Sequence, residues 1–136
     1  MNGKETYLVQ IDGSSRCNPG PAGIGIRIID PEGNVVKEIS RFIGKRTNNQ
    51  AEYEALITAL NEIRLIGRHN YVIHTDSELL YNQLQGRYKV RNQQLKELHA
   101  QAKRLLSLLP NVTIRLVPRT ENRLSDRLAK SASHTS

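Results

Sequence analysis

The sequence predicts an α/β fold in which a five-stranded mixed sheet is flanked by helices, with the element order βββαβααβα. Three strand-like segments near the N-terminus are joined by short connections, which is typical of an antiparallel meander. The rest of the chain alternates apolar residues at helical spacing with two further strand-like segments. The 136 residues contain no repeat, low-complexity tract or interdomain linker, so we expect one domain covering residues 1–136.

The first three elements are predicted from turn residues and strand-like runs. Residues 6–12 (TYLVQID) are expected to form the first strand, 23–29 the second and 35–43 the third. Residues 18–23 (NPGPAG) are expected to form a loop, because their prolines and glycines break regular structure. Residues 30–34 (DPEGN) form the next predicted turn.

Helical spacing begins near residue 49. Leu56, Ala59, Leu60 and Ile63 recur at the period of a helix, and Gly67 stands where a helix commonly ends. The remaining elements are expected to be a strand at 71–75, a short helix at 77–84, an amphipathic helix at 92–109 ended by Pro110, a strand at 112–117 and a helix at 122–133.

Composition narrows the function. The net charge of +7 suggests a polyanionic partner such as a nucleic acid, although charge that serves only solubility is the plainer alternative. Cys17 is the only cysteine, so no disulfide can form within the chain. No N-terminal apolar segment resembles a signal peptide, and no apolar run approaches the ~20 residues that a membrane span needs. We therefore expect a cytoplasmic protein with no membrane contact.

Two acidic residues in the N-terminal half of the chain are candidate functional residues. Asp12 ends the first predicted strand, although an Asp12–Gly13 pair is also typical of a turn. Glu52 lies on the apolar face of its helix and should point toward the sheet, whereas Glu54 points almost the opposite way. A carboxylate directed at a core is costly unless it is paired or binds a metal.

Two more acids come later in the chain. Asp76 follows a strand at the end where ligand sites collect in sheet-based folds, but it or Ser77 could simply cap the next helix. Asp126 lies in the last helix, where an ion pair with Lys130 at i+4 is the alternative. The four acids together point to a site for hard cations, which prefer oxygen ligands. The four histidines show no zinc spacing.

Five short segments in order carry a family resemblance. They are Asp12–Gly13–Ser14, NPGPAG at 18–23, TNNQAE at 47–52, Thr75–Asp76–Ser77 and RTENRLSDRLA at 119–129. With them the chain closely resembles the type 1 ribonucleases H over roughly residues 7–132. The resemblance implies a ribonuclease H-like fold, with the five-stranded sheet and helix order given above. It also implies hydrolysis of the RNA strand of RNA–DNA hybrids, giving 5′-phosphate and 3′-hydroxyl ends.

The resemblance assigns roles to residues. Asp12, Glu52, Asp76 and Asp126 match four acidic ligands of two Mg²⁺ ions, which Mn²⁺ can replace, and the counterpart of Asp12 bridges both ions. The positions implied to contact the hybrid are Gly13, Ser14, Asn18, Asn48 and Asn49 near its minor groove, and Thr47 and Asn92 at a phosphate of the DNA strand. Thr47, Asn48 and Asn92 are also in positions suited to helix capping.

The chain departs from some relatives in two places. Residues 85–92 are short where some relatives carry a long basic insertion, and we expect no separate N-terminal hybrid-binding module, so hybrid affinity should either be weaker or be carried by other basic residues. The loop at 118–122 lacks the histidine that many relatives carry, which concerns turnover; Arg119 or Glu121 would have to substitute. We expect His74 to contribute to packing and not to catalysis. The candidate basic residues are Arg87, Lys89, Arg91, Arg119, Arg123, Arg127 and Lys130, of which the last three also suit a solvated helix face.

Two other functions remain open on this scaffold. One is a non-catalytic module that binds hybrids or other nucleic acids, and the intact set of four acids argues against it. The other is a different nuclease, such as a transposase or integrase core or a domain of a reverse transcriptase. The segment at 47–52 favours a ribonuclease H over an integrase. We expect a monomer without an obligate protein partner.

Overall fold

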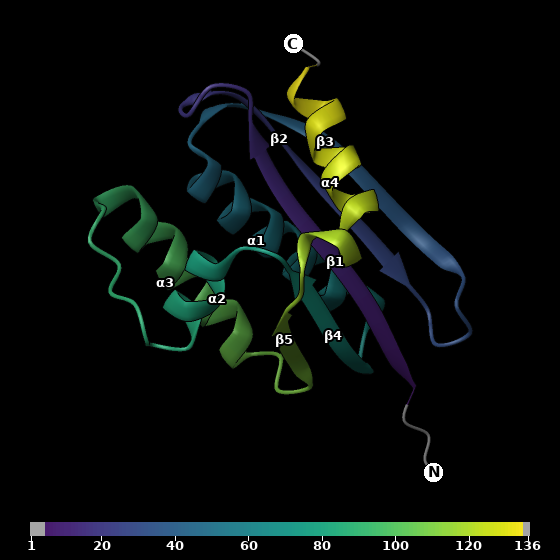
Figure 1. Ribbon diagram of the computed structural model, residues 1–136. Coiled ribbons are helices and arrows are strands. Elements are labelled where there is room, and N and C mark those ends of the chain that lie inside the picture. Colours follow the sequence, from purple (N-terminus) through teal and green to yellow (C-terminus); the bar gives the residue numbers. More distant parts are fainter. Residues whose placement is uncertain (1–4, 135–136) are drawn as a thin grey trace.

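The computed structural model describes residues 5–134. Its five strands form one mixed sheet in the order β3-β2-β1-β4-β5 (Figure 1). The first three strands pair antiparallel, and β4 and β5 run parallel to β1. The predicted fold class and the antiparallel meander are therefore confirmed. The strands are β1 (Thr6–Ser15), β2 (Gly20–Ile29), β3 (Val35–Arg46), β4 (Asn70–Thr75) and β5 (Val112–Leu116).

Helices cover both faces of this sheet. Helix α4 crosses the front of β1, β2 and β3, and α1 lies behind the sheet with α3 packed beside it (Figure 1). A short 3-10 turn precedes α4. The element order βββαβααβα is confirmed, and each helix begins and ends within two residues of its predicted position. The helices are α1 (Asn48–Ile66), α2 (Glu78–Leu84), α3 (Gln93–Ser107) and α4 (Arg123–Ser133), and the 3-10 turn is Arg119–Glu121.

The main core lies between the sheet and α1. Alternate residues of β1 and β2 point toward α1, as the two-residue period of a strand requires, and they meet the apolar stripe of that helix. Burial of these side chains is the main source of stability. The fully or nearly fully buried members include Val9, Ile11, Ile24, Ile26, Ile28, Leu56, Leu60, Ile63 and Ile73.

Three strand boundaries predicted from the sequence were wrong, all at the same end of the sheet. Strand β1 continues to Ser15, β2 begins at Gly20 and β3 continues to Arg46. The register pairs Ser14 with Gly23 and Ser15 with Ala22, so Asp12 and Gly13 lie inside a strand and not in a turn. Prolines and glycines predicted a loop up to residue 23, but here the small residues adopt extended, paired backbone.

The turn at residues 30–34 and the caps at Thr47 and Asn92 are confirmed as predicted. The Asp30 carboxylate accepts hydrogen bonds from the backbone of Glu32 and Asn34, and Gly33 adopts φ +91° in this turn. Thr47 caps α1 in a reciprocal capping box with Gln50. Helices α2 and α3 are capped by the side chains of the residues just before them. No helix in the described part of the chain is long and apolar enough to cross a membrane.

Candidate functional site

Three carboxylates from different elements meet at one end of the central strands. Oxygen atoms of Asp12, Glu52 and Asp76 all lie within 4.8 Å of one another. Asp12 comes from β1, Glu52 from α1 and Asp76 from the residue after β4. Asp12 is only 4% exposed. The fold thus brings together three of the four acids selected from the sequence, which are 40 and 24 residues apart along the chain.

Gly13 lets Glu52 approach β1. A Cβ atom at Gly13 would lie 2.2 Å from the carbonyl carbon of Ala51, so only glycine allows α1 to pack this closely. The backbone N–H of Gly13 donates to Glu52 Oε1 at 3.1 Å. This confirms that Glu52 points toward the sheet. Glu54, on the other side of the helix, pairs instead with Arg46.

Gly25 plays the corresponding part for Asp126. It is the register partner of Asp12, and a Cβ atom there would lie 2.1 Å from the carbonyl oxygen of Ser125. Helix α4 therefore packs directly on β2, and the carboxyl group of Asp126 comes close enough to that of Asp12 to raise its pKa. The predicted ion pair with Lys130 is also present, at 3.2 Å. Asp126 thus joins the cluster through Asp12 and pairs with Lys130 as well.

Asp76 is available to the cluster because it does not cap a helix. Ser77 is the N-cap of α2, and its hydroxyl accepts from the backbone of Leu80 at 3.1 Å. A pocket of about 680 Å³ opens beside Glu52 and Asp76. Arg119, from the 3-10 turn before α4, also lines this pocket. An open pocket beside clustered acids is a common arrangement for a ligand site.

The carboxylates perturb one another. Burial, and then the charges of Glu52 and the other acids, raise the pKa of Asp12 above its ordinary value. Burial and the charge of Asp76 also raise the pKa of Glu52, although the Gly13 N–H and Arg119 oppose this rise. Burial raises the pKa of Asp76 against the opposing effects of Asn122 and Arg119. Several acids this close cannot all be ionised at low cost unless a cation sits among them.

The donor set fits a hard divalent cation. It consists of carboxylate oxygens, with no thiol or imidazole in the cluster that the described residues form. Mg²⁺ prefers such oxygen ligands, and Mn²⁺ accepts them as well. His74 lies in β4 between Gln10 of β1 and Arg115 of β5, where burial lowers its pKa.

The predicted minor-groove residues gather at the start of α1. The backbone N–H of Ser15 donates to Asn48 Oδ1 at 2.8 Å, and the N–H of Asn48 donates to Asn18 Oδ1 at 2.9 Å. These bonds join the β1–β2 loop to the helix. Asn49 is exposed in the same turn. Asn48 therefore ties the loop down and does not act as a helix cap.

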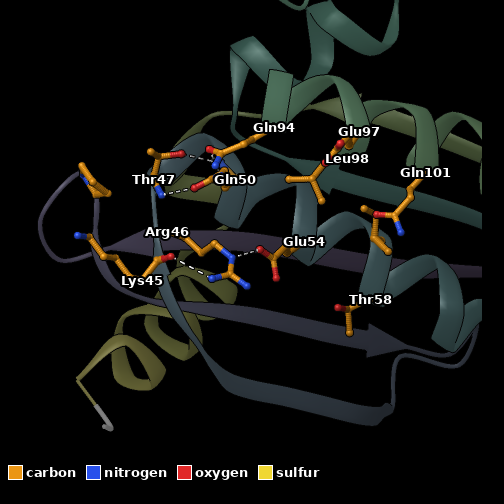
Figure 2. A pocket seen from close by; sticks show the side chains of 12 residues that line it. Lys45, Arg46, Thr47, Gln50, Glu54, Thr58, Gln94, Glu97, Leu98 and Gln101 are labelled. Atoms are coloured by element: carbon orange, nitrogen blue, oxygen red, sulfur yellow. Dashed lines mark hydrogen bonds and ion pairs between the residues drawn. The ribbon is translucent and has the colours of Figure 1, made fainter. Parts of the chain in front are cut away.

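The two predicted DNA-strand residues cap neighbouring helices. Thr47 caps α1, and Asn92 caps α3 by accepting from the backbone of Leu95. A hydrogen bond of 2.8 Å from Gln50 Nε2 to Gln94 Oε1 holds the starts of these helices together. Figure 2 shows Thr47, Gln50 and Gln94 among the residues that line a pocket of about 670 Å³. Asn92 does not line this pocket.

No role was predicted for Asn122, yet its side chain is fully buried beside the cluster. Its Nδ2 donates to the carbonyl oxygen of Ile11 at 2.7 Å and to Asp76 Oδ2 at 3.3 Å. An asparagine just before a helix is typical of an N-cap, but this side chain makes no capping hydrogen bond. The only signal in the sequence was its position four residues before Asp126.

Comparisons with known proteins settle the family. A family model described as reverse transcriptase-like matches residues 10–132. The crystal structure of ribonuclease H1 from the archaeon Halobacterium salinarum is 36% identical and superposes with a TM-score of 0.90, over 96% of this chain and 99% of that one. This chain belongs to the type 1 ribonuclease H family. Its fold superposes on those of ribonuclease H1 structures over most of the chain.

Two further relatives resemble this ribonuclease H family member over most of its length. LC11-RNase H1 in complex with an RNA/DNA hybrid is 40% identical, with a TM-score of 0.86 over 93% of this chain and 95% of that one. The bifunctional protein Rv2228c of Mycobacterium tuberculosis is 38% identical over 92% of this chain. The chain spans only 35% of the length of that protein and of the other first curated relatives.

Proposed function

We propose that this ribonuclease H family member is an endonuclease that hydrolyses the RNA strand of RNA–DNA hybrids, leaving 5′-phosphate and 3′-hydroxyl ends. The observation that carries the proposal is the convergence of Asp12, Glu52 and Asp76, with Asp126 joined to Asp12. A relative that is 40% identical has been crystallised with an RNA/DNA hybrid, which supports the substrate.

The four acids would hold two Mg²⁺ ions, or Mn²⁺ in their place. Bound in this way, a pair of ions activates a water molecule and stabilises the leaving oxygen of a phosphodiester. The chain supplies the rest. The Gly13 N–H orients Glu52, and Lys130 partly balances the charge of Asp126. Arg119 favours the ionised forms of Glu52 and Asp76, which is the state that binds a cation.

The RNA strand would be recognised by the amides at the start of α1. Asn18 and Asn48 use their Oδ1 atoms on backbone N–H groups, and within residues 5–134 their NH₂ groups have no hydrogen-bond partner. Together with Asn49 and the backbone around Gly13 and Ser14, they would meet 2′-hydroxyl groups and base edges in the minor groove. The 2′-hydroxyl both donates and accepts hydrogen bonds and distinguishes RNA from DNA.

The DNA strand would be held by a phosphate at Thr47 and Asn92. Both residues stand at helix N-termini, where backbone N–H groups and the helix dipole favour an anion. The net charge of +7 supports binding along the backbones of both strands. We further propose that residues 1–136 act as a single monomeric ribonuclease H domain in the cytoplasm, where exposed Cys17 would stay reduced.

The test is cleavage of matched labelled substrates. The purified chain is incubated with RNA–DNA, DNA–DNA, RNA–RNA and single-stranded RNA, each with Mg²⁺, Mn²⁺ or EDTA. An Asp12→Asn variant purified in parallel reports contaminating nuclease. Phosphatase treatment and polymerase extension of the fragments identify their 5′ and 3′ ends.

We expect cleavage of the RNA strand of the hybrid alone, dependent on metal and lost in Asp12→Asn. A hybrid that is bound but remains whole with either metal would instead support the non-catalytic module. Cleavage of DNA–DNA duplex in preference to the hybrid would point to another nuclease of this scaffold.

A further inference from the structure

The side chain of Asn122 lies in the protein interior next to the acid cluster. It is fully buried, and both interactions of its Nδ2 atom are with acceptors, the Ile11 carbonyl at 2.7 Å and Asp76 Oδ2 at 3.3 Å. Rotating the amide by 180° would place its oxygen against these two acceptors. The orientation of the side chain is therefore fixed by its surroundings.

The backbone of Asn122 contacts the cluster as well. Its carbonyl oxygen accepts from the N–H of Asp126 at 3.2 Å and from the hydroxyl of Ser125 at 3.0 Å. Ile11 directly precedes Asp12 in β1. Asn122 thus bonds to the strand that carries Asp12, to the carboxylate of Asp76 and to the backbone of Asp126. Glu52 is held separately, by the N–H of Gly13.

The Oδ1 atom of Asn122 gains no hydrogen bond within residues 5–134 from this orientation. This atom is buried and has no hydrogen-bond partner among the described residues. A buried carbonyl oxygen without a donor destabilises a fold, and an apolar side chain of similar size would avoid that cost. Such a side chain would, however, lose both hydrogen bonds of the N–H₂ group, to β1 and to Asp76, so these two contacts are what the asparagine provides.

We propose that Asn122 is a positioning residue that sets the separation of Asp12, Asp76 and Asp126 for metal binding and turnover. This inference rests on the proposed function, because it concerns the same site. Asn122 acts through the acids and does not itself touch substrate. Groups that orient metal ligands in this way affect metal affinity or activity by roughly 10–100-fold when they are removed.

Asn122→Ala removes the amide, and Ser125→Ala is the matched control. The control deletes a buried hydrogen bond to Asn122 in the same turn of α4 but leaves the amide contacts intact. Circular dichroism melts report folding, and calorimetry with Mn²⁺ alone reports metal binding. Steady-state kinetics on the hybrid with Mg²⁺ give kcat and KM, and hybrid Kd is measured in EDTA.

We expect Asn122→Ala to lower kcat and Mn²⁺ affinity by about tenfold or more, with KM and the hybrid Kd in EDTA nearly unchanged. Ser125→Ala should lose thermal stability and keep both kcat and Mn²⁺ affinity. A folded Asn122→Ala protein with wild-type kcat and Mn²⁺ affinity overturns the inference. Equal losses of kcat in the two variants do so too, because they would show a structural role only.

Failure of the proposed function and failure of the positioning role of Asn122 give different results. If the wild-type protein fails to cut the hybrid, the proposed function fails, and weaker Mn²⁺ binding by Asn122→Ala still supports positioning. If Asn122→Ala does not fold, Asn122→Ser is judged by the same criteria. Failure of both variants to fold would make Asn122 a structural residue and overturn the inference.

Discussion

Replacing Asp12 by asparagine removes a negative charge from the cluster without changing the size of the side chain. Asp12 is buried, and its carboxylate lies within 4.8 Å of those of Glu52 and Asp76. In the absence of metal, this repulsion is a cost of folding that the unfolded chain does not bear. We therefore expect Asp12→Asn to be inactive and yet more stable than the wild-type protein in EDTA.

The distance between the carboxylates sets the size of this gain in unfolding free energy. Two unit charges 4.8 Å apart repel by about 3.5 kcal/mol at an effective dielectric constant of ~20. Asp12 faces two such neighbours, but protonation of one member of the cluster limits the cost to roughly one pair. We expect a gain in unfolding free energy of about 2–4 kcal/mol, or a rise in Tm of roughly 10 °C for a domain of this size.

The pH dependence has a defined sign. The pKa values of Asp12, Glu52 and Asp76 are raised in the folded state. The wild-type protein therefore loses stability as the pH rises from the ordinary carboxyl range through these raised values. The advantage of Asp12→Asn should be small near pH 4 and grow toward neutral pH.

Thermal melts in EDTA and in Mg²⁺ between pH 4 and 8 provide the assay. Mg²⁺ should raise the Tm of the wild-type protein much more than that of Asp12→Asn. Glu62→Gln is the control, because Glu62 forms a surface ion pair with Lys37 and its loss should cost no more than about 1 kcal/mol. An Asp12→Asn protein less stable than wild type in EDTA, or a wild-type Tm insensitive to Mg²⁺, would refute this reasoning.

Three other predictions concern packing, charge and salt. Gly25→Ala places a Cβ atom 2.1 Å from the Ser125 carbonyl, so urea melts should show a loss of about 1–3 kcal/mol and kcat should fall; unchanged kcat would contradict this role of Gly25. Arg119→Ala should raise the pKa of Glu52 and Asp76, moving the acidic limb of the kcat–pH profile to higher pH and raising the Mg²⁺ midpoint; an unmoved limb would count against it. Hybrid Kd should rise steeply with KCl, since binding releases counterions, and a flat plot of log Kd against log salt would exclude phosphate contacts as its main source.

Local sequence was sufficient for the elements and for most helix ends. Apolar spacing predicted α1, and the Thr47 and Asn92 caps stand where the sequence placed them. These features depend on residues a few positions apart, so they can be read from one stretch of chain. The strand ends near Ser15 and Gly20 could not, because pairing across strands determines whether a glycine- and proline-rich segment is extended.

For the four acids too, local sequence identified the residues, and tertiary packing determined their contacts. The family motifs selected Asp12, Glu52, Asp76 and Asp126, but the local context of each acid alone suggested a turn, a paired core residue, a cap or a surface ion pair. The structure shows that Ser77 caps α2, so Asp76 does not act as the cap and can join the cluster. Asp126 pairs with Lys130 and also lies close to Asp12. The approach of Asp126 to Asp12 could not be predicted from sequence neighbours, because it depends on how α4 packs on the sheet.

By itself, the sequence determined the family, the order of elements and the identity of the candidate acids. Only the tertiary structure decided how close those acids come, because the approach of α1 and α4 to the sheet is set by atoms missing at Gly13 and Gly25. It also revealed Asn122, whose amide bonds to Ile11 across 111 positions of sequence. Contacts of such separation leave no periodic signal in a single chain, so the arrangement of the site emerges only when the sheet and helices pack.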